Sequence, residues 1–328
     1  MFAAQTAKQD GNFGSGGGGG HQKQTRSCYF FTAPILPKSA PTTKDLCTRL
    51  CIPLQIYRIN RPTAAMPQSI RFEHNAATLR AEPLTEATGP VRLVWLHGWG
   101  QSREGLRAIA ESLVHAGESW ILDLPGHGEA PNPPEPYSPA KYAKLVAAWL
   151  ATQPACPTII LGHSLGFRVA IHLAAQKTPG LIGLVSLAGA GVPKILSPKQ
   201  AVRRKYVQLL IKLGKGLKPI LGDMPLNRLR QRFGSTDYLN VSPDLRPTFL
   251  AVVNDNVANL CPEISLPTLL IYGESDTETP PSVGERFRSL LPQAQLHLLP
   301  HQTHYSIVAG GRHVTAPLIQ QFLRTLAL

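Results

Sequence analysis

The sequence predicts an α/β protein with a doubly wound, mostly parallel sheet and a helical insertion that forms a lid. From about residue 70 onward, short apolar runs rich in β-branched residues alternate with segments of helical period. Such alternation is typical of βαβ units and of a parallel sheet buried on both faces. One long segment, at about 191–262, interrupts the alternation with helical character and no strand pattern. Right-handed crossovers between the strands then produce the doubly wound arrangement.

The expected strands are short apolar runs bounded by glycine, proline or polar turn residues. In chain order they cover residues 91–96, 119–124, 157–164, 181–189, 267–273 and 294–300. The expected helices carry apolar residues three and four positions apart, which indicates one buried face. They lie near 103–115, 140–150, 165–176, 283–291 and 316–326.

The insertion contains one apolar helical face of its own. Its members follow one another at spacings of four, four, three and four residues: Val202, Tyr206, Leu210, Leu213 and Leu217. This spacing predicts an amphipathic helix. Ligands of open α/β sheets bind outside the carboxyl ends of the strands, so we expect the insertion to cover a site there.

Residues 1–65 are expected to form an extension separate from the α/β domain at 66–328. They include the glycine tract 14–20 and scattered prolines without a sustained period. Their basic, acid-poor composition resembles an organellar targeting segment. The alternative, which we favour, is a disordered tail or upstream sequence translated from a misplaced start, with Met66 as the natural start.

The formal net charge of +13 is concentrated in two segments. Residues 1–65 hold eight basic and two acidic residues, and residues 191–235 hold eleven basic residues and one acidic residue. The remainder has fourteen basic and seventeen acidic residues. This distribution disfavours a general nucleic-acid-binding protein and predicts one local basic surface.

The cysteines and the hydropathy place the chain among cytoplasmic proteins without metal. The five cysteines form no CxxC pair, so we expect reduced thiols and no zinc site. No stretch approaches the ~20 apolar residues that a transmembrane helix needs. We therefore predict a cytoplasmic protein.

The segment Gly162-His163-Ser164-Leu165-Gly166 is the strongest chemical signal. It follows an apolar strand and precedes a segment that can form a helix. A GxSxG sequence in that setting predicts a nucleophile elbow, in which a tight turn exposes the serine oxygen at the edge of the sheet. The helix N-terminus directs its positive dipole toward developing negative charge. Ser164 is the predicted nucleophile.

Serine needs a base, and histidine is suited to that role near neutral pH. His304 follows the last expected strand at the sheet edge where Ser164 should lie. His301 is the alternative, but it comes directly after Pro300 and is expected to belong to the turn. We therefore predict His304 as the base.

The base needs a carboxylate that orients it. Asp276 follows the strand at 267–273 and precedes Pro280, which fixes a turn. Glu274 and Glu278 are alternatives, but both can be ordinary surface charges that water solvates. Asp276 is the predicted acid, and the order Ser…Asp…His is one of the known chain orders of this triad.

The sequence His97-Gly98-Trp99-Gly100 follows the strand at 91–96 and predicts an oxyanion loop. We assign the two oxyanion-hole amides to Trp99 and Leu165, the latter being the residue after the nucleophile. His97 is expected to brace the loop.

Together these segments resemble the α/β-hydrolase superfamily over about residues 70–328. The matching motifs are HGWG at 97–100, DLPGHG at 123–128, GHSLG at 162–166, GESDTETP at 273–280 and HQTHY at 301–305. The resemblance implies the triad and oxyanion roles given above and a structural role for Asp123. Phe167 and the pair Glu129-Ala130 depart from the family's pattern.

HGWG is also similar to esterases that cleave the methyl ester of a pimeloyl carrier protein. Those enzymes recognise an acidic acyl carrier protein through basic lid residues. The predicted lid of this chain also carries basic residues: Arg203, Arg204, Lys205, Lys212, Lys215, Lys218, Arg228, Arg230 and Arg232. Docking of an acidic carrier or an anionic membrane surface is one interpretation, and a merely solvated helix face is the other.

The leading hypothesis is a serine hydrolase that cleaves a small-molecule carboxylic ester or thioester through an acyl-enzyme, with no metal and no organic cofactor. C–C bond hydrolysis or perhydrolysis on the same triad is an alternative. A non-catalytic scaffold that binds a ligand or an acidic partner is the third hypothesis.

Overall fold

The computed structural model describes residues 69–85, 90–194 and 241–326, and the single positions 202, 205, 206, 209 and 210. All of them belong to the second of two units, Arg61–Leu328. The predicted extension at 1–65 and most of the predicted lid lie outside the described residues. The predicted domain boundaries therefore stay predictions.

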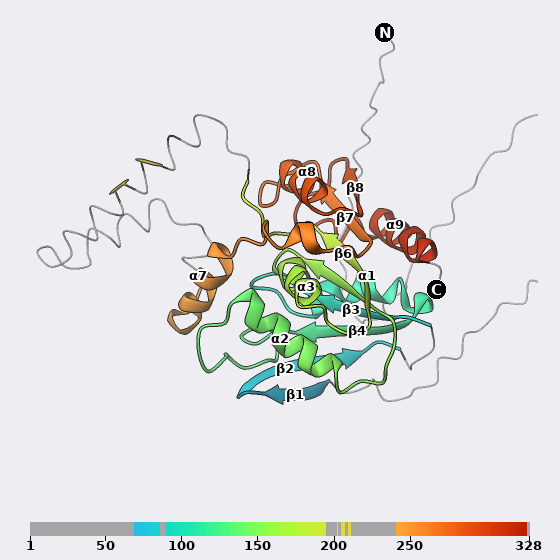
Figure 1. The fold of residues 1–328 in the computed structure, drawn as a ribbon, viewed down its shortest axis with the longest axis horizontal. Coiled ribbons are helices and arrows are strands. Elements are labelled where there is room, and N and C mark those ends of the chain that lie inside the picture. The colour runs from blue at the N-terminus through green and yellow to red at the C-terminus, as the bar shows by residue number, and fades with distance from the viewer. Residues whose placement is uncertain are drawn as a thin grey trace, which may run out of the picture. The chain divides into compact units, whose positions relative to one another are not determined.

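The described strands form one sheet in the order β1-β2-β4-β3-β5-β6-β7-β8 (Figure 1). The strands from β4 to β8 pair in parallel, whereas β1 and β2 are antiparallel. The predicted mostly parallel α/β sheet is thus confirmed. The bounds are β1 (Ile70–His74), β2 (Ala77–Pro83), β3 (Arg92–Leu96), β4 (Glu118–Asp123), β5 (Thr158–His163), β6 (Leu181–Leu187), β7 (Thr268–Gly273) and β8 (Ala294–Leu299).

The hairpin of β1 and β2 was not predicted. Its turn is made by Asn75 and Ala76, with φ values of 48° and 61°. Two successive residues with positive φ are typical of a tight hairpin turn, in which glycine normally follows asparagine. Alanine at the second position removes that signal, and β1 is largely exposed, so the strand lacks a buried apolar pattern.

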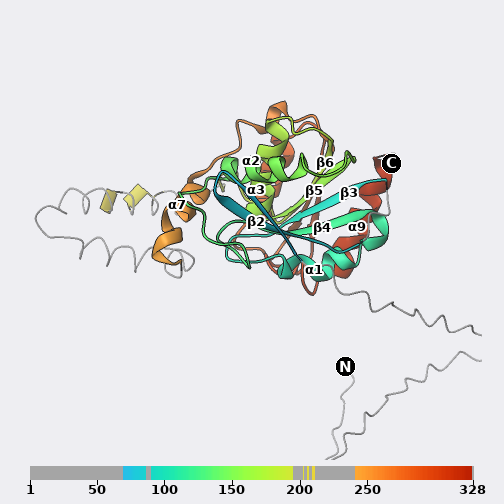
Figure 2. The same ribbon diagram turned by 90° about the horizontal axis from the view of Figure 1, so that it is seen from below.

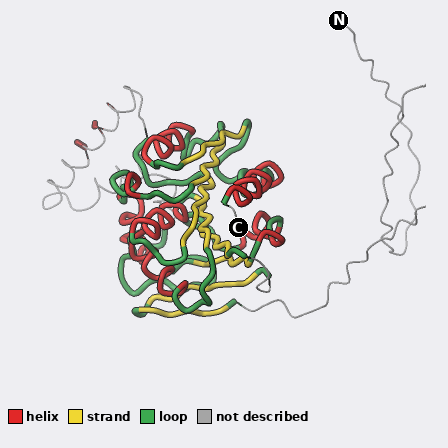
Figure 3. The backbone as a smooth tube through the Cα atoms, turned by 45° about the vertical axis from the view of Figure 1, so that its right-hand side comes forward, coloured by secondary structure: helices red, strands yellow, loops and turns green. Residues whose placement is uncertain are grey.

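Helices cover both faces of the sheet, as Figures 2 and 3 show. The side chains of β3 alternate between two cores: Val94 and Leu96 belong to the core under α2, α3 and α8, and Leu93 and Trp95 to the core under α1 and α9. The period of two follows from the strand geometry. The helices are α1 (Glu104–Glu111), α2 (Pro139–Leu150), α3 (Leu165–Ala175), α7 (Arg246–Asn254), α8 (Pro281–Leu290) and α9 (Arg312–Thr325).

Helix α7 belongs to the predicted insertion and is fastened to the sheet domain. The Thr248 hydroxyl accepts a hydrogen bond from the Tyr137 amide at 3.1 Å. Val202 and Tyr206, from the predicted apolar face, are helical and exposed, and Leu210 is helical and half-buried. Leu213 and Leu217 lie outside the described residues. No helix in the described part of the chain has both the length and the apolarity needed to cross a membrane.

Candidate active site

Ser164 stands at the sharp turn between β5 and α3. Its backbone has φ 49° and ψ −106°, a strained conformation for a residue other than glycine. The strain is held by backbone hydrogen bonds from Ser164 N to Leu187 O and from Ala190 N to Ser164 O, each 3.1 Å long. A turn of this kind, which presents a serine at the end of a strand, is the geometry expected of a nucleophile elbow.

The two glycines of the GxSxG segment are required by close backbone contacts. A Cβ atom at Gly162 would collide with the amide nitrogen of Phe167. At Gly166 it would collide with the carbonyl oxygen of Leu96 on the neighbouring strand β3. Small residues at both positions therefore allow α3 to begin directly against the sheet.

Asp276 and His304 come together although 28 residues separate them. His304 Nδ1 lies 2.8 Å from Asp276 Oδ2. Both side chains are buried, Asp276 after β7 and His304 after β8. The two strands are parallel neighbours, so both loops leave the same edge of the sheet. The contact fixes the proton of a neutral imidazole on Nδ1 and leaves Nε2 free to act as a base.

Thr279 completes the surroundings of Asp276. The amides of Glu278 and Thr279 donate to Asp276 Oδ1 at 2.7 and 2.8 Å. The Thr279 hydroxyl lies 2.9 Å from Asp276 Oδ2 and 3.1 Å from His304 Nδ1. Burial by itself raises the pKa of Asp276, but the hydrogen bonds from His304 and Thr279 outweigh it and lower the pKa below the ordinary 3.8. The carboxylate is thus ionised at neutral pH.

The alternatives weighed for the acid and the base lie elsewhere. Glu274 and Glu278 are exposed, and His301 is exposed in a turn with φ 60°. Among the described residues, no hydrogen bond joins the side chains of Ser164 and His304. Hydrogen bonds between catalytic groups are often long before a substrate binds.

His163, the residue before Ser164, contacts His304. Its ring centroid is 4.8 Å from that of His304, and its Nε2 lies 2.9 Å from the His304 carbonyl oxygen. Its Nδ1 lies 2.7 Å from Gln101 Oε1. Burial and the nearby His304 lower the pKa of His163 to about 4. A neutral ring carries one N–H and so donates to one of these two oxygens at a time.

The loop after β3 carries Trp99, which is predicted to supply one oxyanion amide. Gln101 Oε1 accepts a hydrogen bond from Gly98 N at 2.9 Å, which folds the loop back on itself. Leu165 is the first residue of α3. Among the described residues, neither the Trp99 amide nor the Leu165 amide donates to a protein acceptor. The assignment of these two amides to an oxyanion hole stays a prediction.

His97 braces this loop, as expected. Its Nδ1 contacts Gly98 O at 2.7 Å, and its Nε2 accepts a hydrogen bond from Leu124 N at 3.0 Å. Burial and the neighbouring His127 lower the pKa of His97 to about 3. The ring is neutral and has no free nitrogen for chemistry.

Asp123 has the structural role implied by the family resemblance. It accepts hydrogen bonds from the amides of Arg103 and Glu129 at 2.7 and 3.0 Å, and it also pairs with the Arg103 guanidinium. A Cβ atom at Gly128 would collide with its carboxylate. The turn at 125–128 is thus built around this side chain.

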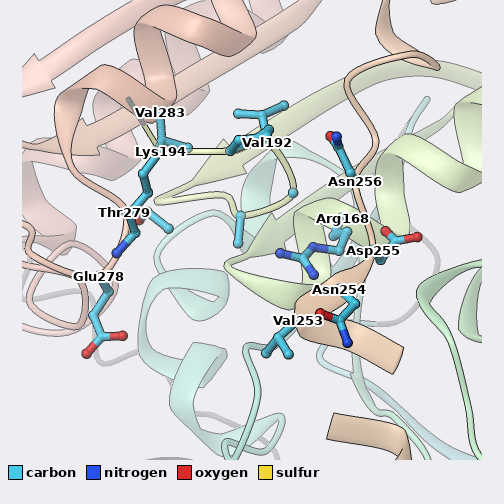
Figure 4. A pocket seen from close by; sticks show the side chains of 13 residues that line it. Arg168, Val192, Lys194, Val253, Asn254, Asp255, Asn256, Glu278, Thr279 and Val283 are labelled. Atoms are coloured by element: carbon cyan, nitrogen blue, oxygen red, sulfur yellow. The ribbon is translucent and has the colours of Figure 1, made fainter. Parts of the chain in front are cut away.

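Two cavities lie beside these groups. One of about 500 Å³ is lined by Trp99, Gln101, His127, Leu245 and Tyr305, among others. The other, of about 580 Å³, lies toward β6 and β7 and is drawn in Figure 4. The two ends of α7 reach different cavities: Leu245, just before the helix, lines the first, and Val253, near its end, lines the second.

Sequence reasoning missed Thr279, Gln101 and His163 as parts of the site. A signal existed for Thr279, since an aspartate followed three residues later by threonine before Pro280 is typical of a side chain that accepts from the next backbone amides. Gln101 and His163 carry no such signal.

Within the described ranges, no group of three or more His, Cys, Asp or Glu side chains could hold a metal ion.

Comparisons with known proteins show the family of the chain. The family model described as "Alpha/beta hydrolase family" matches residues 93–316. A pimeloyl-[acyl-carrier protein] methyl ester esterase of Neisseria meningitidis serogroup A is 30% identical over 65% of this chain and 71% of its own. The esterase of that name from Xylella fastidiosa strain M12 is 28% identical over 73% and 96%.

A solved structure supports the fold. The thermophilic esterase from Thermogutta terrifontis aligns with a TM-score of 0.56 at 21% identity, over 79% of this chain and 99% of that one. At that identity the likeness concerns the arrangement of strands and helices.

Proposed function

Because the chain belongs to the alpha/beta hydrolase family, we propose that it cleaves a carboxylic ester or thioester through an acyl-enzyme carried by Ser164. His304 Nε2 takes the hydroxyl proton as Ser164 Oγ attacks the carbonyl carbon. The Trp99 and Leu165 amides stabilise the oxyanion. The tetrahedral intermediate collapses, and His304 returns the proton to the departing alcohol or thiol. Water then attacks the acyl-enzyme in the same way, releasing the acid.

The observation that carries this proposal is the 2.8 Å contact between His304 Nδ1 and Asp276 Oδ2 at the sheet edge where the strained Ser164 turn lies. A buried carboxylate with a lowered pKa holds the imidazole in the tautomer that leaves Nε2 as the base. It also stabilises the imidazolium that forms during each proton transfer. A scaffold used only for binding would need neither the strained serine nor the buried acid–base pair.

The substrate is proposed to arrive on an acyl carrier protein. Two relatives bear names that specify a pimeloyl-carrier-protein ester. The basic residues of the predicted lid would complement an acidic carrier. Apart from Lys205, which is exposed, these residues lie outside the described part of the chain. The test compares kcat/KM for a carrier-linked ester and for the free ester at low and high salt. Docking of an acidic carrier predicts a preference for the linked ester that weakens at high salt. C–C hydrolysis and perhydrolysis would use the same triad, and no feature of the described site favours either.

A Ser164→Ala variant tests the reaction. With an activated p-nitrophenyl ester, the wild type should give a burst of nitrophenol, and a fluorophosphonate probe should label it at Ser164. Both signals should vanish in the variant, because the acyl-enzyme cannot form. Ser289→Ala, at an exposed position on α8, is the matched control and should retain both. Turnover that persists in Ser164→Ala would refute the proposal.

A further inference from the structure

The hydroxyl of Thr279 contacts three groups that come from different parts of the chain. Its Oγ1 lies 2.9 Å from Asp276 Oδ2, 3.1 Å from His304 Nδ1 and 3.0 Å from the carbonyl oxygen of Ala188. The residue is only 6% exposed, so solvent has little access to these contacts. The contact with Ala188 is the one that extends beyond the acid and the base.

The carbonyl of Ala188 belongs to the segment that holds the nucleophile. Ala188 directly follows β6 and has a φ value of 50°, an unusual conformation for alanine. Its neighbours bind the backbone of Ser164 on both sides: the Ser164 amide donates to Leu187 O, and the Ala190 amide donates to Ser164 O, each at 3.1 Å. One hydroxyl therefore connects the acid–base pair with the segment 187–190, in which the serine turn is fastened.

The chemistry of the three partners makes this hydroxyl both a donor and an acceptor. The ionised carboxylate of Asp276 and the carbonyl of Ala188 can only accept, and a hydroxyl has one proton to give to either of them. His304 Nδ1 carries the proton of the neutral imidazole, so the hydroxyl oxygen can accept from it beside Asp276 Oδ2. The position of Thr279 Oγ1 is thus fixed from three directions.

We propose that Thr279 is a positioning residue of the reaction. Its hydroxyl fixes the acid–base pair, Asp276 and His304, relative to the segment 187–190. Through that segment it determines how His304 Nε2 meets Ser164 Oγ in each proton transfer. This inference rests on the proposed esterase function and adds a residue that neither attacks the substrate nor carries the proton.

A purely structural role would place different demands on the side chain. Thr279 would then fill space and close the turn after Asp276, in which the amides of Glu278 and Thr279 donate to Asp276 Oδ1. These amide bonds do not involve the hydroxyl and should survive its removal. Valine resembles threonine in shape but lacks the hydroxyl, whereas serine keeps the hydroxyl and lacks the methyl group. The two substitutions therefore separate positioning from packing.

Steady-state hydrolysis of p-nitrophenyl acetate by the full-length chain tests the proposal. In Thr279→Val, kcat should fall roughly 10- to 100-fold, because a misplacement of about 1 Å can cost 10²-fold in rate. KM should change less than about twofold, since no group that binds the substrate is lost. Thr279→Ala, a second variant without the hydroxyl, should behave like Thr279→Val. Thr279→Ser restores the hydroxyl and should recover kcat to within about fivefold of the wild type.

Thr178→Val is the matched control. Thr178 is 8% exposed, and its hydroxyl donates to the backbone carbonyl of Leu173 at 2.8 Å. It precedes β6, whereas the triad follows the carboxyl ends of the strands. The substitution removes the same kind of buried hydrogen bond far from the reacting groups, so kcat should stay at the wild-type value.

Proton NMR adds a readout that needs no turnover. The Nδ1 proton of His304 should give a downfield signal, because it lies in a short, buried hydrogen bond to a carboxylate. Its loss in Asp276→Asn assigns the signal, which should shift in Thr279→Val and stay in place in Thr178→Val. An unshifted signal, wild-type kcat in Thr279→Val, or a Thr279→Ser variant as slow as Thr279→Val would refute the inference. Absence of Ser164-dependent turnover in the wild type would instead refute the proposed function.

Discussion

The amide variant Asp276→Asn should reverse the tautomer of His304. Asp276 Oδ1 is held by the amides of Glu278 and Thr279 at 2.7 and 2.8 Å, so the amide oxygen of an asparagine must take that place. Its NH2 group then occupies the position of Oδ2, 2.8 Å from His304 Nδ1. Two donors cannot face each other there, so Nδ1 must become the acceptor and Nε2 must carry the proton.

With Nε2 protonated, His304 cannot accept the proton of Ser164. We expect kcat to fall roughly 10⁴-fold, which corresponds to about 5 kcal/mol of transition-state stabilisation. Steady-state hydrolysis of a p-nitrophenyl ester measures the loss, and the rate of fluorophosphonate labelling measures the nucleophile directly. Glu274→Gln, which neutralises an exposed acid two residues away, is the control and should lose less than about twofold. Asp276→Asn activity within tenfold of the wild type would refute the assigned role.

Two other predictions follow from contacts at the same sheet edge. Gly98→Ala would place a Cβ atom 2.7 Å from Gln101 Oε1 and 2.8 Å from His163 Nδ1, displacing the Trp99 amide, so kcat should fall by roughly 10²–10³ with little change in KM. Gly105→Ala is the control, because a Cβ atom there would have nothing within 4 Å. Equal kcat values for the two variants would contradict the oxyanion assignment. Because the pKa of folded Asp276 lies below the ordinary 3.8, its contribution to the free energy of unfolding is present above that pH and is lost as the pH falls through the folded pKa. Urea unfolding at a series of acidic pH values should show a shallower decline for Asp276→Asn than for the wild type, and parallel curves would count against the lowered pKa.

Much of the fold could be predicted because its signals are local. Each parallel strand is a buried apolar run, and each of these runs in the described part lies within about two residues of its expected bounds. The hairpin of β1 and β2 was missed because β1 is exposed and its turn carries Ala76 where glycine is usual. Exposure and an unusual turn residue remove the two patterns on which strand prediction depends.

The candidate site shows the same division. Ser164, Asp276 and His304 could be singled out because each follows a strand that ends at one edge of the sheet. Gln101 and His163 could not, because no local pattern shows that their side chains meet at this edge. Their contact, at 2.7 Å, joins residues that are 62 positions apart in the sequence. Contacts between residues so far apart produce no periodic pattern in the sequence.

The ring of His163 contacts two loops that are distant from it in the sequence. It is attached to β5, which ends directly before Ser164. It touches the loop after β3 through Gln101 and the turn after β8 through the His304 carbonyl. A shift of either loop is therefore transmitted to the other through one rigid, neutral imidazole. A substitution that moves Gln101 or the turn at His304 should therefore disturb the position of His163 and, through the backbone, that of Ser164.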